Sequence, residues 1–451
     1  MMNWEQLLSN QRLGMENMPA KADDRTEFQR DYDRLIFSAP FRRLQNKTQV
    51  FPLPGSIFVH NRLTHSLEVS SVGRSLGNDV SRILLQKHPW LYNTHLSELG
   101  SIVSAACLAH DMGNPPFGHS GERAIGTYFS EGDGQWLKDY VCEETGDSLT
   151  PEQWQDLIHF EGNANAFRLL THHFNGRRKG GFVMTYSTLA SIVKYPFSSD
   201  MAGSHRKFGF FRSEVEDYKL IAETLGIKKL DAPEGSIRYA RHPLVYLVEA
   251  ADDICYEIMD IEDAHKLKIL TENETKELLL GFFEGEQLEH IKQRLETVDD
   301  INEQVVYLRS VAINCLEGEC VNVFVENEEA ILDGTFEGSL IDHISEKPRK
   351  AYKACEQTSY QKIYHSKNVI DIEIAGFKVI TELTDLMMHA VTHSDKAYSK
   401  LLINRVSSQY DILAPTLYER VMAVLDYISG MTDVFALDLY RKINGMTLPN
   451  V

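Results

Sequence analysis

Apolar side chains recur at the spacing of an α-helix along most of this sequence, and no other feature constrains the fold as strongly. In a charged segment from 24 to 38, Phe28, Tyr32, Leu35 and Ile36 form one apolar stripe. Similar patterns occupy four further segments: residues 98–111, 244–263, 284–300 and 416–440. Strand signals are confined to two short segments, 51–58 and 369–374, which are expected as short strands or extended chain. The sequence therefore predicts an all-α fold with at most a few short strands.

The domain organisation follows from the same pattern. A chain of 451 residues is long enough for a large buried core, and it contains no internal repeat or low-complexity tract. Residues 130–151 are expected as a surface loop and 175–181 as a basic turn, and neither has the composition of a domain linker. We predict a single large helical domain over residues 1–451, with a core at about 60–265 and a C-terminal helical extension at about 330–451.

Composition places the chain among ordinary globular proteins, with 43% hydrophobic and 25% charged residues. No apolar run approaches the roughly 20 residues needed to cross a bilayer. The first twenty residues mix Trp4, Glu5 and Arg12 and do not resemble a signal peptide. The six cysteines form no CxxC pair, and Cys107 and Cys255 lie in apolar helical patterns. These features predict a cytoplasmic protein without a membrane partner.

The net charge of −19 argues against broad, nonspecific binding to nucleic acid. It also limits how such a chain can bind a polyphosphate. The positive charge would have to be concentrated locally, in a divalent metal ion and in a few lysine or arginine side chains.

The most informative segment runs from His110 to Glu122 and reads HDMGNPPFGHSGE. It places two metal-competent side chains at the end of an apolar helix, followed by a Gly/Pro-rich turn and then by His119 and Glu122. Adjacent residues on a helix point about 100° apart, so His110 and Asp111 can share one ion only near a helix end. A buried helix ends in two such costly polar groups only when they are paired or bind a metal.

Two other segments carry groups of the same kind. Arg62 and His65 share one face of a predicted helix, and Asp252, Tyr256 and Asp260 recur every fourth residue on the 244–263 helix. Taken alone, each pattern is more typical of a satisfied histidine or a solvated face. Together with the His110 segment, they predict one site of two imidazoles and two carboxylates, a ligand set that favours Mn, Fe or Mg over thiolate-bound zinc.

The order His65, His110-Asp111, Asp252 resembles the H…HD…D pattern of the HD phosphohydrolase superfamily. Longer segments resemble its bacterial dGTPase branch, the deoxynucleoside triphosphate triphosphohydrolases: FRRLQNKTQVF (41–51), NRLTHSLEV (61–69), AHDMGNPPFGHSGE (109–122), FEGNAN (160–165) and EAADDICY (249–256). The resemblance extends from about residue 24 to at least 386, with weaker matches at 194–196, 207–211 and 363–369. It implies a helical HD-domain fold and hydrolysis of a dNTP to a deoxynucleoside and inorganic triphosphate.

The resemblance also implies roles for individual residues. One divalent ion, Mn or Mg or alternatively Fe, Ni or Co, would be bound by His65, His110, Asp111 and Asp252. Asp252 is preferred to its neighbour because the sugar-facing tyrosine of the family follows the ligand by four positions. His119 would transfer a proton, with Glu122 orienting or stabilising its imidazole; direct attack of His119 on phosphorus is the alternative.

The remaining implied roles concern substrate and assembly. Phosphate contacts would come from Arg62, Lys194, Tyr195 and Lys207, sugar contacts from Gln49, Tyr256 and Asp260, and parts of the pocket wall from Glu161 and Asn163. A tyrosine ring against the 2′ carbon leaves no room for a ribose hydroxyl. Members of the family form homo-oligomers, some of them regulated by nucleotides or single-stranded nucleic acid, and the sequence leaves base preference open.

Two other functions are compatible with parts of this pattern. One is an HD nucleotidase or phosphodiesterase acting on monophosphates or cyclic dinucleotides, and the other is a nucleotide-sensing or nucleic-acid-binding regulator with weak activity. The complete ligand set together with His119 and Glu122 favours a triphosphohydrolase, because a pure binding protein has no need of a proton-transfer pair.

Overall fold

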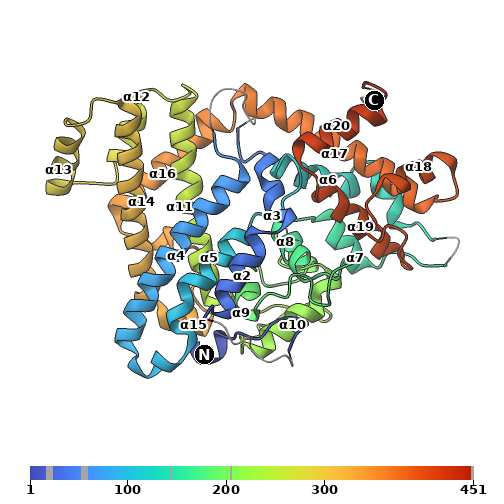
Figure 1. Ribbon diagram of the computed structural model, residues 1–451, viewed down its shortest axis with the longest axis horizontal. Coiled ribbons are helices and arrows are strands. Elements are labelled where there is room, and N and C mark those ends of the chain that lie inside the picture. The colour runs from blue at the N-terminus through green and yellow to red at the C-terminus, as the bar shows by residue number, and fades with distance from the viewer. Residues whose placement is uncertain (17–23, 52–58, 143–144, 204–205, 448–451) are drawn as a thin grey trace.

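A computed structural model describes residues 1–16, 24–51, 59–142, 145–203 and 206–447. Within these ranges the fold is helical, and the only β-structure consists of isolated bridges (Figure 1). The prediction of an all-α fold is confirmed. None of the described helices is long and apolar enough to cross a membrane.

A first group of helices lies in the part of the chain up to residue 266. Their bounds are α1 Trp4–Leu7, α2 Glu27–Ile36, α3 Ala39–Arg43, α4 Arg62–Lys87, α5 Leu99–Ala109, α6 His119–Ser130, α7 Pro151–Ile158, α8 Gly162–Thr171, α9 Tyr186–Ser191, α10 Val215–Thr224 and α11 Pro243–Lys266. The rest of the chain adds α12 Glu272–Leu280, α13 Gly285–Leu295, α14 Ile301–Glu326, α15 Glu328–Asp333, α16 Glu346–Thr358, α17 Lys367–Thr392, α18 Ala397–Arg405, α19 Leu417–Ser429 and α20 Asp433–Ile443.

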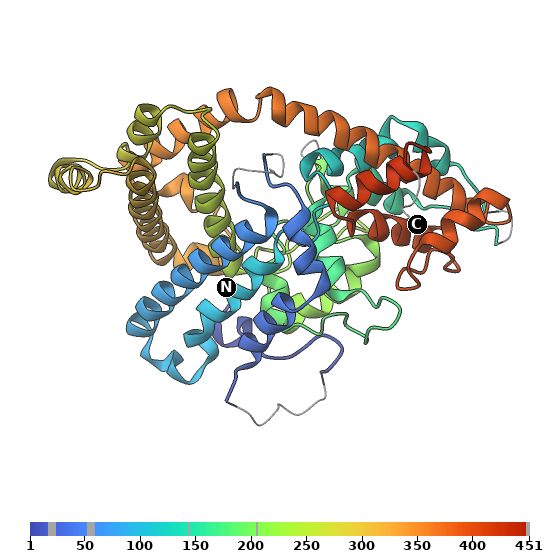
Figure 2. The ribbon, with the colours of Figure 1, turned by 45° about the horizontal axis from the view of Figure 1, so that its top comes forward.

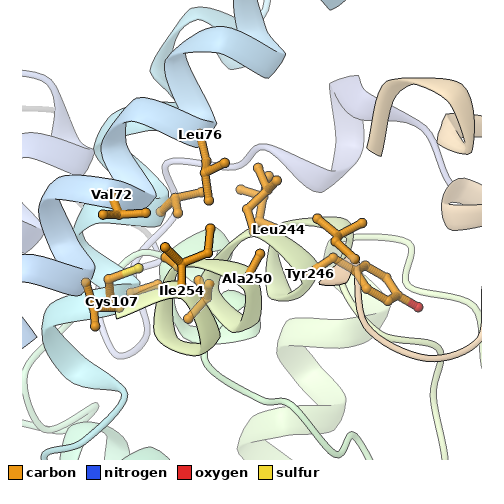
Figure 3. Close-up of a cluster of buried hydrophobic side chains, with 14 of the residues drawn as sticks. Val72, Leu76, Cys107, Leu244, Tyr246, Ala250 and Ile254 are labelled. Carbon is orange, nitrogen blue, oxygen red and sulfur yellow. The ribbon is translucent and has the colours of Figure 1, made fainter. Parts of the chain in front are cut away.

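The main core is built around α4, α5 and α11. Nearly every residue of α5 is buried, and Figure 3 shows Cys107 of α5 among Val72 and Leu76 of α4 and Ile254 of α11. The helices α4 and α5 approach closely because Gly77 has no side chain: a Cβ there would lie 2.8 Å from the backbone of α5. This tight packing brings the N-terminus of α4 and the C-terminus of α5 to fixed positions beside α11.

A second hydrophobic cluster joins distant parts of the chain. It includes Phe129 of α6, Leu157 of α7, Ile380 of α17 and Val421 of α19. Figure 2 shows α17, in orange, running across the molecule to the C-terminal helices in red. The helix α17 packs directly against α6, which begins with His119, and α18, α19 and α20 pack against α17.

Four sequence-based expectations about elements need correction or lie outside the described residues. Residues 369–374 belong to α17 and not to a strand, because their apolar residues continue a 26-residue helix. The segment 416–440 is two helices, since Thr432 caps a new helix by accepting a hydrogen bond from the Phe435 amide. The segment 284–300 is helical only to Leu295. Of the possible strand 51–58, residues 52–58 lie outside the described part of the chain.

Candidate active site

Local sequence signals fix the helix ends that carry the candidate site. Asn61 caps α4 by accepting a hydrogen bond from the Thr64 amide at 3.0 Å, while the Thr64 hydroxyl accepts from the Asn61 amide at 3.1 Å. Arg62 is therefore the first residue of the helix, and His65 lies on the same face one turn later. At the start of α11, Pro243 occupies the first turn, where its missing amide hydrogen costs nothing.

Two imidazoles and two carboxylates meet where α4, α5 and α11 converge. The Nε2 atom of His65 lies 3.0 Å from Oδ1 of Asp252, and Nε2 of His110 lies 3.4 Å from the same oxygen and 3.7 Å from Oδ1 of Asp111. Ligand atoms of His65, His110 and Asp111 all lie within 4.8 Å of one another. The structure thus places Asp252, and not Asp253, against both imidazoles.

Neighbouring groups orient this cluster for a cation. The Nδ1–H of His110 donates to the Cys107 carbonyl at 2.6 Å, which points Nε2 toward the carboxylates. Burial disfavours a charged imidazole, yet Asp111 and Asp252 raise the pKa of His110 to about 9. The two carboxylates thus attract positive charge to this cluster. The donor set, its orientation and this charge all fit one divalent metal ion.

The turn between α5 and α6 is held by close packing and by one distant carboxylate. Gly113 lies against α8 so closely that a Cβ would be 2.1 Å from the Ala166 amide nitrogen, and Phe117 has a φ of 62°, which is rare for a residue with a side chain. The two oxygens of Asp433, at the start of α20, accept hydrogen bonds from the backbone amides of Phe117 at 2.9 Å and Thr48 at 2.8 Å. Asp433 therefore joins this turn to the segment that carries Gln49.

His119 begins α6 and faces the cavity. Partial removal from water, together with the nearby charges of Arg62 and Lys207, lowers the pKa of His119 to about 4. The imidazole is therefore neutral at pH 7 and able to accept a proton.

Glu122, which the resemblance assigned to orient His119, has two other contacts in the structure. Its Oε1 lies 3.0 Å from the ammonium group of Lys207, and its Oε2 accepts a hydrogen bond from the Gly162 amide at 3.2 Å. Glu161 caps α8 and lies 2.8 Å from the same ammonium group. Lys207 thus bridges two carboxylates on one wall of the cavity, beside Asn163.

All three cationic side chains expected at the phosphates are paired with carboxylates. Arg62 donates to Asp111 at 2.7 Å, and Lys194 lies 3.0 Å from Glu249. The Lys194 ammonium also lies 5.9 Å from the centre of the Tyr195 ring. Arginine and lysine have several N–H donors each, so these pairs hold the cations in place without using all of their donors.

The groups expected at the sugar line the same cavity or contact its lining. The ring of Tyr256 stands edge-on to His65 with centroids 6.2 Å apart, and Asp260 accepts a hydrogen bond from the Tyr364 hydroxyl at 2.8 Å. The Oε1 atom of Gln49 is buried and has no hydrogen-bond partner within the described residues. A buried acceptor of this kind is costly unless a ligand or water supplies a donor.

These groups line one cavity of about 570 Å³. Of the residues assigned to the site from the sequence, His65 and Asp260 are not part of the lining but contact residues that are, and thirteen line the cavity: Gln49, Arg62, His110, Asp111, His119, Glu122, Glu161, Asn163, Lys194, Tyr195, Lys207, Asp252 and Tyr256. Sequence reasoning missed seven others, namely Asn114, Asp253, Glu257, Tyr352, Glu356, Tyr360 and Tyr364. Asn114 and Asp253 lie inside the motifs at 109–122 and 249–256, and Tyr364 lies inside the weaker match at 363–369. The other four, Glu257, Tyr352, Glu356 and Tyr360, lie outside all of these segments.

Comparison with known proteins agrees with this architecture. The HD domain family matches residues 62–194, and a phosphohydrolase-associated domain matches 343–442. A deoxyguanosinetriphosphate triphosphohydrolase-like protein of Pseudomonas aeruginosa is 38% identical over the full length of both chains. One from Synechocystis is also 38% identical, over 99% of this chain and all of the relative. The chain belongs to the deoxyguanosinetriphosphate triphosphohydrolase-like family of HD-domain phosphohydrolases.

A relative named deoxyguanosinetriphosphate triphosphohydrolase, from Yersinia enterocolitica, is 30% identical over 94% of this chain and 96% of its own. The two matched domains meet at the cavity. His65, His110, Asp111 and His119 lie in the HD match, whereas Tyr352, Tyr360 and Tyr364 lie in the associated domain. In this member of the family, the associated domain therefore contributes directly to the wall of the candidate site.

Proposed function

We propose that this protein hydrolyses deoxynucleoside triphosphates to the deoxynucleoside and inorganic triphosphate with the help of one divalent metal ion. The observation that carries the proposal is the composition of a single cavity. Metal-competent side chains, a histidine able to accept a proton, three cationic side chains, Tyr256 and Gln49 all line the same cavity. The names of the relatives support the same substrate class.

The metal would be held by His65, His110, Asp111 and Asp252. When bound, it supplies concentrated positive charge for the reacting phosphate. The hydrogen bond from His110 to Cys107 and the contact between Asp111 and Arg62 fix the orientation of these ligands in advance. Binding of the ion would therefore require little rearrangement of these side chains.

The cations would bind the triphosphate through the donors that their carboxylate partners leave free. Arg62 lies beside the metal donors, and Lys194, Tyr195 and Lys207 line the same cavity. A substrate with several negative charges is thus bound by local positive charge, although the protein as a whole carries a net charge of −19.

His119 would transfer the proton. Removal from water and, next to it, the charges of Arg62 and Lys207 lower the pKa of its imidazole, which favours the neutral form. A bound triphosphate cancels part of the charge on those two side chains, which raises the pKa of His119 and makes it a stronger base. Glu122 would act through Lys207, by fixing the position of that ammonium group beside His119.

Selection of a deoxyribose would depend on three groups. Tyr256 presents a ring edge beside the metal donors, Asp260 is held in position by Tyr364, and Gln49 has an unused buried acceptor. A 3′-hydroxyl supplies the donor that Gln49 or Asp260 requires, and a buried polar match of this kind discriminates strongly between substrates.

The experiment that tests the proposal is a substrate panel with product identification. Purified protein is incubated with each of the four dNTPs, with GTP, with dGMP and with a cyclic dinucleotide, in Mn²⁺, in Mg²⁺ and in chelator. We expect metal-dependent release of inorganic triphosphate from at least one dNTP. Release of orthophosphate from dGMP, or cleavage of the cyclic dinucleotide alone, would assign a different reaction, and metal binding without turnover would indicate a regulator.

A further inference from the structure

A second cavity, of about 380 Å³, lies among the C-terminal helices and shares none of its lining residues with the candidate active site. Its walls come from the end of α3, the end of α18 with the loop that follows, and the facing ends of α19 and α20. The lining residues are Arg43, Arg405, Val406, Ser407, Tyr410, Tyr427, Gly430, Met431, Thr432 and Phe435. Its volume is in the range of cavities that hold small organic ligands.

Two guanidinium groups give this cavity a positive charge. Arg405 ends α18 with its guanidinium carbon 5.5 Å from the centre of the Phe435 ring, and Arg43 donates to the Gly430 carbonyl at 3.2 Å. None of the described residues that line the cavity is acidic. The neighbouring carboxylates are engaged elsewhere: Asp426 accepts from Arg168 with both oxygens, and Asp433 accepts from two backbone amides.

Aromatic side chains form the rest of the wall. The rings of Tyr410 and Tyr427 meet edge to face with centroids 5.7 Å apart, and Phe435 lies under Arg405. Only 7% of the surface of Tyr427 is exposed, and its hydroxyl has no hydrogen-bond partner within the described residues. Among the described residues neither guanidinium group pairs with a carboxylate, so both retain N–H donors for an anion beside this hydroxyl.

We propose that this cavity binds a small aromatic anion, a ring that carries a phosphate or a carboxylate. The ring would pack against Tyr410 and Phe435, while the anionic group would accept hydrogen bonds from Arg43, Arg405 and the Tyr427 hydroxyl. Guanidinium groups bind both phosphate and carboxylate in a bidentate manner. The lining therefore favours an aromatic anion but does not distinguish a phosphate from a carboxylate. The site is separate from the proposed catalytic function and does not depend on it.

The test uses phenyl phosphate as the probe and isothermal titration calorimetry of the full-length protein. Arg405→Glu places a negative charge at the site and, because Arg405 is exposed, is not expected to affect folding; circular dichroism checks this. Arg441→Glu, at the exposed end of α20, is the matched control. We expect Arg405→Glu to raise the Kd by about tenfold or more, and Arg441→Glu to leave it within about twofold.

Two further variants identify where the probe binds. Tyr427→Phe removes only the hydroxyl and is expected to raise the Kd several-fold, while Arg62→Ala weakens anion binding at the other cavity and is expected to leave the Kd unchanged. Benzoate as a second probe separates the two acid groups: tighter binding of phenyl phosphate assigns a phosphate site, and tighter binding of benzoate a carboxylate site. Equal affinity of wild type and Arg405→Glu, loss of binding in Arg62→Ala alone, or inorganic phosphate binding as tightly as phenyl phosphate would overturn the proposal.

Discussion

The imidazole of His119 faces the cavity, and cationic neighbours help to lower its pKa to about 4. We predict that His119→Ala keeps the fold and the metal content but lowers kcat for dNTP hydrolysis by about 10² to 10⁴, the usual contribution of a general acid or base. The matched control is His173→Ala, an exposed histidine outside the cavity. Steady-state kinetics and metal analysis of both variants check this, and equal turnover in His119→Ala would remove it from the mechanism.

At the level of single residues, the sequence predicted those whose neighbours form recognisable local patterns. His110, Asp111, His119 and Glu122 lie within one short segment, so their proximity follows from chain connectivity. The pairing of Lys207 with Glu122 could not be predicted, because it depends on how distant loops pack around the cavity.

The metal cluster allows two adjacent carboxylates to be distinguished. We predict that Mn²⁺ added to the metal-free protein raises its Tm, since an ion that binds only the folded state adds about 2.7 kcal/mol at a concentration 100 times its Kd. Asp252→Asn is expected to abolish this rise, because Asp252 contacts both imidazoles. Asp253→Asn, one position away, is expected to keep it. A rise that survives in Asp252→Asn but not in Asp253→Asn would reverse the ligand assignment.

At the scale of elements, the N-terminus of α20 holds the turn that carries His119. Asp433 accepts one backbone hydrogen bond with each carboxylate oxygen, whereas asparagine has only one acceptor oxygen and places an NH₂ group against an N–H donor. We predict that Asp433→Asn lowers kcat more than tenfold and destabilises the protein by about 1–3 kcal/mol, the cost of a buried unsatisfied amide.

Asp438→Asn is the matched control, because Asp438 lies on the same helix and, among the described residues, pairs with the exposed Lys442. Kinetics and denaturant unfolding of the two variants provide the measurement. If the Asp433 variant lost stability but kept the wild-type kcat, Asp433 would be a packing residue without influence on the catalytic turn.

The start of α11 has its own pH dependence. His242 accepts a hydrogen bond from the Leu244 amide through Nδ1 and donates to the Leu7 carbonyl through Nε2, so it must be neutral in the folded state. Burial lowers the pKa of His242 from 6.5 to about 4. Between these values the unfolded chain binds the extra proton, so stability falls as the pH drops, by about 1.4 kcal/mol at pH 5.5 relative to neutral pH.

In His242→Asn the amide oxygen can still cap the helix, but the side chain does not titrate. We predict a shallower loss of stability between pH 7.5 and 5.5 in this variant than in wild type, measured by urea unfolding at both pH values. Identical slopes for the two proteins would show that another group controls stability in this range.

Helix positions were predictable where one amphipathic period ran without interruption, as in α5 and α11. The sequence was misleading where apolar content was the only signal: 369–374 looked extended but continues α17, and the break before α20 was hidden within one long apolar pattern. Thr432 caps α20 inside that pattern. The turn just before it is held against α3 by the hydrogen bond from Arg43 to the Gly430 carbonyl.

At the scale of the whole molecule, the candidate site is built from residues of both matched domains. The HD match accounts for most of the metal donors, but four lining residues come from 352–364, a stretch whose π-helical turn at Ser359–Ile363 has no sequence signature. Their arrival at the cavity depends on the packing of α16 and α17 against distant helices, which a single sequence does not encode in any local pattern.

The hydrogen bond between Thr48 and Asp433 joins positions 385 residues apart. Because a ribosome builds the chain from its N-terminus, every residue of the HD segment has emerged long before Asp433 is synthesised. During that interval the turn between α5 and α6, which leads into His119, lacks the Asp433 carboxylate that holds its backbone. A nascent or prematurely terminated polypeptide that lacks Asp433 can therefore carry the complete motif without the contact that holds its turn.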